Sequence, residues 1–219
     1  MADHTEDSLI REIDDELRQE QFQKVWNRYS KLILAAAGLC VAAVAGYQFW
    51  IKHDLETRQA LGERFDNAQK QAETGSIDAA VTTFRTLADE GGGYGLLARF
   101  QAAGLLAKEG DQAGAVAAYD AIAADKSIDK LYQDLAVILA AGIEVNDPGA
   151  DLQKLQDRLA PLSKAGSPWR FTAQELTAAA ALRAGDKAKA REIYGELAKD
   201  NATPARMRQR ATELLTILR

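Results

Sequence analysis

One long apolar run stands out from an otherwise mixed pattern of apolar and polar residues. The twenty residues from Leu32 to Ile51 include no Asp, Glu, Lys or Arg. At a rise of about 1.5 Å per residue, a helix of this length reaches about 30 Å, which matches the hydrocarbon core of a bilayer. Trp26, Tyr29 and Trp50 lie near its ends, where aromatic rings settle at membrane surfaces. The pattern predicts one membrane-crossing helix over residues 32–51.

The same run has two other interpretations, a buried helix of a soluble protein and a cleaved signal peptide. Buried soluble helices seldom lack charges over such a length. Ala43 to Ala45 reads Ala-Val-Ala, which matches a signal-peptide cleavage site. However, residues 1–31 contain eight acidic and five basic residues, whereas a signal peptide begins with a short basic region. This mismatch favours an uncleaved anchor.

Residues 1–31 form an acidic stub in front of the predicted anchor. Ile10, Ile13 and Leu17 recur at helical spacing, with acidic residues between them. We expect a short amphipathic helix here. It is either a solvated stalk beside the membrane or a docking helix for a partner.

Small residues follow one side of the predicted span. Gly38, Ala42 and Gly46 are spaced by four residues, an arrangement that lets two membrane helices approach closely. They are a candidate packing face for a second helix. The alternative is that an alanine-rich span produces such a triple by chance.

Beyond residue 51 a turn pattern repeats. Copies begin at Gly75, Gly110 and Gly185, and each has an aromatic residue nine positions later and an aliphatic residue twelve positions later. A helical stretch precedes each copy, so the unit is helix, tight turn, helix. We predict an all-α domain of paired helices over residues 52–219. Ala115 and Ala190 should lie in the seams between helices, and Ala117 should face water.

The repeat resembles the tetratricopeptide repeat, since its first two glycines are 35 residues apart. The expected fold is therefore a transmembrane helix followed by a tetratricopeptide-repeat-like α-solenoid. The middle unit, about residues 129–165, is degenerate; there we expect Asp147 to cap a helix and Pro148 to occupy its first turn. Ser167 and Pro168 should start the next helix in the same way. The last helix should close the solenoid with an apolar side that includes Met207 and Ala211.

This resemblance also implies a binding surface, because tetratricopeptide repeats line a concave groove with their first helices. Alignment on the turn glycines places six residues there: Leu97, Phe100, Lys108, Glu175, Leu182 and Arg183. Apolar anchors among charged groups suit a peptide segment better than a small molecule. A register shifted by one residue would instead make Leu97, Phe100 and Leu182 plain core residues.

Composition and motifs offer no argument for an enzyme. The net charge is −5, and no basic stripe is present that would bind nucleic acid. The lone cysteine, Cys40, lies in the predicted span, and His4 and His53 have no metal-ligand spacing around them. The glycines of Gly91 to Gly95 lack the Lys-Ser/Thr of a phosphate loop, so we interpret them as a flexible joint between repeats. We expect no catalytic residue, cofactor, metal or small-molecule substrate.

The whole arrangement resembles one known family. It is similar to the ancillary Sec translocon subunits of bacterial inner membranes in four features. These are an acidic stub, one anchor near residue 40, a degenerate repeat domain and the stretch from Pro168-Trp169 to Ala181-Leu182-Arg183-Ala184-Gly185-Asp186. The resemblance implies a cytoplasmic N-terminus, a periplasmic repeat domain, and association with translocon subunits and with periplasmic chaperones or clients. The alternative is a structural, cell-envelope or cell-division adaptor whose membrane helix stabilises a larger complex.

Overall fold

The structure is a computed structural model that describes residues 3–218, with side chains from Gln23 onward except those of Val25, Asn27 and Ile33. The described residues form helices joined by turns, and none of them lies in a strand. The chain divides into an N-terminal unit, residues 1–60, and a repeat unit, residues 61–219. This confirms the predicted all-α class. The domain boundaries 1–31, 32–51 and 52–219 remain predictions.

Helix α1 runs from Asp3 to Glu73. Within the N-terminal unit its large apolar side chains, such as those of Leu39 and Phe49, are exposed. Among the described residues, α1 is the one helix long and apolar enough to cross a membrane, over a stretch within Arg28–Glu73. The amphipathic pattern predicted for Ile10, Ile13 and Leu17 involves side chains outside those described.

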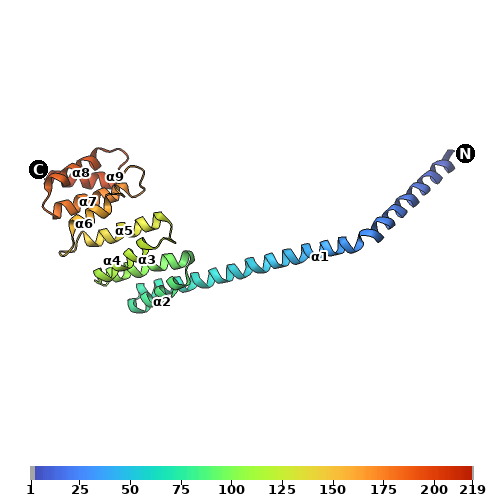
Figure 1. Ribbon diagram of the computed structural model, residues 1–219, viewed down its shortest axis with the longest axis horizontal. Helices are drawn as coiled ribbons and strands as arrows, with labels where there is room; N and C mark the ends of the chain where they lie inside the picture. The colour runs from blue at the N-terminus through green and yellow to red at the C-terminus, as the bar shows by residue number, and fades with distance from the viewer. Residues whose placement is uncertain (1–2, 219) are drawn as a thin grey trace. The chain divides into compact units, whose positions relative to one another are not determined.

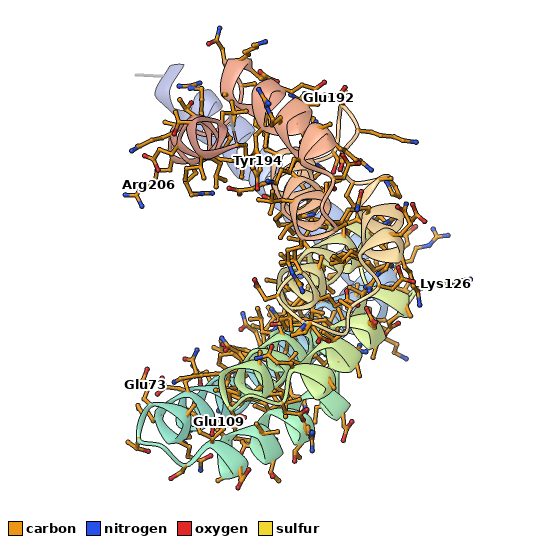
Figure 2. All side chains as sticks on the ribbon, turned by 90° about the vertical axis from the view of Figure 1, so that its left-hand side faces the viewer. Glu73, Glu109, Lys126, Glu192, Tyr194 and Arg206 are labelled. Carbon is orange, nitrogen blue, oxygen red and sulfur yellow. The ribbon has the colours of Figure 1, made fainter. Side chains whose placement is uncertain are left out.

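The repeat unit contains the last turns of α1 and the helices that follow (Figure 1). These are α2 (Ile77–Glu90), α3 (Gly92–Lys108), α4 (Gln112–Ala124), α5 (Lys130–Glu144), α6 (Leu152–Leu159), α7 (Arg170–Arg183), α8 (Lys187–Lys199) and α9 (Ala205–Ile217). From α2 onward each helix packs against the next one in sequence. Figure 2 shows the helix pairs of this unit along an open arc, with Glu73 and Arg206 towards its two ends and Lys126 on its outer side.

The repeated turns have the backbone that the sequence predicts. Gly75, Gly110 and Gly185 adopt φ values of 86°, 91° and 84°, a region that residues with a side chain rarely enter. In the second and third copies an aspartate follows. Asp111 accepts a hydrogen bond from the Gly114 amide, and Asp186 accepts one from the Lys189 amide, so each caps the next helix.

The seam residues of each copy are buried. Ala115 and Ala190 are inaccessible to solvent, and Ala117 is exposed, as predicted. The aromatic and aliphatic positions of the three copies also lie in the core: Phe84 and Leu87, Tyr119 and Ile122, and Tyr194 and Leu197. Met207 and Ala211 of α9 join the last core cluster, which confirms the expected capping helix.

The middle unit differs from the sequence-based expectation. The prediction that Asp147 caps α6 and Pro148 lies in its first turn is wrong. The Asp147 carboxylate accepts from the Gly149 amide in a turn before the helix, and Asp151 caps α6 through the Gln153 and Lys154 amides. Both aspartates suit a cap, but only Asp151 directly precedes the helix. The next helix likewise begins later than expected, at Arg170, after a turn that starts at Ser167.

The buried seam gives a prediction about stability. Replacing Ala115 or Ala190 with leucine should overpack the contact between helices and lower the free energy of unfolding by about 1–3 kcal/mol. Ala117→Leu should change it little, because that position is exposed. Thermal melts of the three variants in detergent check this, and equal behaviour of all three would contradict the packing register.

Candidate protein-binding surface

Pairs of fully buried alanines fix how α3, α5 and α7 are rotated. Each helix contains one such pair with a spacing of five residues: Ala98 and Ala103, Ala136 and Ala141, Ala173 and Ala178. Because these pairs occupy equivalent positions, other residues of the three helices can be matched. Leu97 then corresponds to Leu135 of α5, and Lys108 of α3 corresponds to Arg183 of α7.

The sides of helix α5 have different surroundings. Ala136 and Ala140 pack in the cluster shared with α3 and α4, whereas Ile138 and Ala141 pack in the cluster shared with α6 and α7. Residues four apart share a side of a helix, so the third side carries Leu131, Leu135 and Leu139. All three are leucines, and none belongs to a core cluster formed by the described residues.

Exposed apolar side chains gather on α3 and α5. The exposed fractions are 51% for Leu97, 42% for Leu131, 42% for Tyr132 and 37% for Leu139. In the described part of the repeat unit, Ile217 near the C-terminus is the other exposed large apolar side chain, at 77%. We call the set of Leu97, Leu131, Tyr132, Leu135 and Leu139 the apolar face.

The residues predicted on α3 have different surroundings. Leu97 is exposed and belongs to the apolar face. Phe100 is half-buried against the cluster of α3, α4 and α5, and its ring centroid lies 6.1 Å from that of Tyr119. Lys108 is exposed in the last turn of α3. Leu97 and Lys108 are therefore open to a partner, whereas Phe100 also serves packing.

The residues predicted on α7 are engaged within the protein. Both Glu175 carboxylate oxygens accept hydrogen bonds from Arg210 of α9, at 2.9 Å each. Leu182 packs against the cluster of α7, α8 and α9. Arg183 donates to the carbonyl oxygens of Val145 and Asp147 in the α5–α6 turn. The structure thus does not bring the six predicted residues together as one free surface, and their role in binding stays a prediction.

A cavity of about 360 Å³ opens beside the apolar face, between the α2–α3 turn and the α4–α5 loop. Gly91 and Gly92 form that turn with φ values of 73° and 67°, so the predicted joint is a tight turn that connects two helices directly. Tyr132 belongs both to the cavity wall and to the apolar face. The full lining is Ala88, Gly91, Gly92, Gly93, Gly95, Leu96, Arg99, Ser127, Ile128, Asp129 and Tyr132.

The charged groups at this cavity have partners. Arg99 donates to the Asp125 carboxylate at 2.7 Å. This bond, together with those from the Ser127 hydroxyl and amide, lowers the pKa of Asp125 to about 2. Asp129 accepts from the Leu131 amide at 2.8 Å and caps α5. The cavity therefore presents mainly apolar walls and satisfied charges.

A second cavity, of about 340 Å³, lies between α4 and the end of α5 and is more acidic. Arg158 bridges two of its carboxylates, donating to Asp120 at 2.5 Å and to Glu144 at 2.8 Å. Burial raises the pKa of Glu144, and the nearby Arg158 opposes that shift. No cluster of three or more metal-ligating side chains occurs among the described residues.

The α5 leucines were not among the residues predicted to bind a partner. Their spacing of four residues was visible in Leu131, Leu135 and Leu139. The signal was overlooked because the unit containing them lacks the glycine turn on which the other repeats were aligned.

The different surroundings of Leu97 and Phe100 give a prediction. Leu97→Ser should leave the melting temperature close to that of the wild type, because the side chain is half exposed. Phe100→Ser should lower the free energy of unfolding by about 2–4 kcal/mol, because it removes packing against Tyr119. Loss of partner capture by Phe100→Ser without a change in melting temperature would instead make Phe100 a binding residue.

The Arg99–Asp125 pair gives a prediction about pH. In the folded protein the pKa of Asp125 lies below its ordinary value of 3.8. The charged carboxylate therefore stabilises the fold above that pH, and this stabilisation is lost as the pH falls towards 2. Wild type should melt at a higher temperature than Asp125→Asn at neutral pH, and the difference should vanish near pH 2. In an Arg99→Gln background the Asp125→Asn change should matter much less, and an undiminished effect there would contradict the assigned cause.

Comparison with known proteins gives two matches. The model of a family described as tetratricopeptide repeat-like domain matches residues 23–215. The ancillary SecYEG translocon subunit of Escherichia coli (strain K12) is 23% identical over 187 residues, which cover 85% of this chain and 88% of that protein. No solved structure matches the chain.

These matches confirm the resemblance inferred from the acidic stub, the apolar run and the repeats. The family model extends from before the apolar run into α9, so it covers most of the chain. The chain belongs to the tetratricopeptide repeat-like family.

Proposed function

We propose that this protein is a membrane-anchored interaction scaffold and an ancillary subunit of the Sec translocon. The observation that carries the proposal is the similarity to the translocon subunit of Escherichia coli over 85% of this chain. The repeat unit supports it, because stacked helix pairs offer extended surfaces to other proteins. The role is one of binding, not of catalysis.

The proposed topology has residues 32–51 across the bacterial inner membrane, the N-terminus in the cytoplasm and the repeat unit in the periplasm. The apolar stretch of α1 supports the crossing. Four basic residues precede the run within fifteen positions and three follow it within fifteen. Basic residues are more frequent on the cytoplasmic side of membrane helices, so this small excess agrees with a cytoplasmic N-terminus. In the periplasm the repeat unit would link the translocon to chaperones or client polypeptides.

A second candidate function places the interaction in the membrane. Gly38, Ala42 and Gly46 are exposed, and a Cβ atom added at either glycine would meet nothing within 4 Å. This side of α1 is open to a second membrane helix. The protein would then be a structural adaptor whose membrane helix stabilises a larger complex, with the repeat unit as a spacer.

Purification of the tagged full-length protein from its native membrane tests both candidates. We expect translocon subunits to be enriched with the wild type relative to a tagged, unrelated single-pass protein. A variant whose residues 32–51 are replaced by an unrelated transmembrane helix should retain them if the repeat unit carries the contact.

Loss of the translocon subunits on anchor replacement would favour the membrane helix. Gly38→Leu and Gly46→Leu would then be expected to reproduce the loss, since a bulky side chain prevents close approach. Absence of enrichment with the wild type itself would contradict the proposed function.

A further inference from the structure

We propose that the cavity between the α2–α3 turn and the α4–α5 loop receives an aromatic side chain from an uncharged, apolar polypeptide segment that lies along the apolar face. This inference rests on the proposed function. It deepens that function by stating the chemistry of the segment and the place where it is anchored.

The cavity and the apolar face are continuous. Tyr132 is a wall of the cavity, and the exposed Leu131 and the half-buried Leu135 lie close to it along α5. Leu96 and Ile128 supply further apolar walls. A volume of about 360 Å³ with such a lining suits one bulky side chain, and the Tyr132 ring offers a surface for an aromatic contact.

The charge distribution selects an uncharged occupant. The charged residues of the lining are Arg99 and Asp129, and each is engaged, in the ion pair with Asp125 and in the cap of α5. A charged ligand would compete with these contacts, whereas an uncharged side chain leaves both in place. The apolar face itself consists of leucines and one tyrosine. By contrast, the lining of the second cavity, between α4 and the end of α5, includes Asp120, Glu144 and Asp147.

Gly93 allows the cavity to be filled without strain. It lines the cavity in the first turn of α3, its φ is not positive, and a Cβ atom added there would meet nothing within 4 Å. Leucine is also a better helix former than glycine. Gly93→Leu should therefore occupy the cavity and leave the fold intact. Gly195→Leu in α8 is the matched control, because its Cβ is equally free and it lies outside the cavity.

The experiment uses the full-length protein in lipid nanodiscs, with binding to empty nanodiscs subtracted. The probe is a short peptide of alternating leucine and serine with one central tryptophan and a neutral dye, measured by fluorescence anisotropy. We expect Gly93→Leu to weaken binding about tenfold or more and Gly195→Leu to leave it unchanged. Replacing the peptide tryptophan with alanine should weaken binding to the wild type equally, but should have no further effect with Gly93→Leu.

Tyr132→Ser supplies a second variant, which removes a wall of the cavity, and circular dichroism melts verify that all variants fold. Binding of the peptide to Gly93→Leu and Tyr132→Ser as strongly as to wild type would overturn the inference. So would a change in the oligomeric state of Gly93→Leu with peptide binding unchanged, since the occupant would then be a second copy of the chain. If the wild type binds no peptide while translocon subunits still co-purify with it, the inference fails and the proposed function stands. If the wild type binds the peptide but no translocon subunits co-purify with it, the proposed function alone is rejected.

Discussion

The repeat unit depends on helices that approach one another closely at fully buried alanines. In α3, α5 and α7 such alanines recur five residues apart, beginning at Ala98, Ala136 and Ala173. A larger side chain at these positions would push the neighbouring helix away at a cost of about 1–3 kcal/mol. The size of the residue is also limited at Gly95, because a Cβ atom there would lie 3.2 Å from the carbonyl oxygens of Leu87 and Ala88. The rotation of each helix, and hence what it exposes, follows from these contacts.

This constraint explains why apolar side chains remain exposed on α5. Two sides of α5 pack through alanines against the preceding and the following helices. Leu131, Leu135 and Leu139 occupy its third side. Exposed apolar groups that gather on one face are typical of surfaces that bind other proteins. Helix α7 has the same rotation, but Glu175 and Arg183 on it are tied to α9 and to the α5–α6 turn. The open apolar surface is therefore confined to α3 and α5.

The sequence was sufficient for the features that depend on local patterns. Turn glycines, seam alanines and the apolar run each have a short-range signature, and the Gly110 turn and the burial of Ala115 and Ala190 were predicted correctly. Features that depend on contacts between distant residues were not predictable. Glu175 meets Arg210, and Arg183 meets Val145, only after the helices have stacked. The cap of α6 was misassigned because Asp147 and Asp151 both have the local chemistry of a cap, and the helix begins directly after Asp151.

Ion pairs inside the repeat unit connect segments that are distant in sequence. Arg99 of α3 reaches Asp125 after α4, Arg158 of α6 reaches Asp120 of α4, and Arg210 of α9 reaches Glu175 of α7. Charges used in this way tie helices of the repeat unit together, and they already have partners within the protein. In the proposed function, an apolar surface beside such paired charges would bind polypeptide segments by shape and apolar contact.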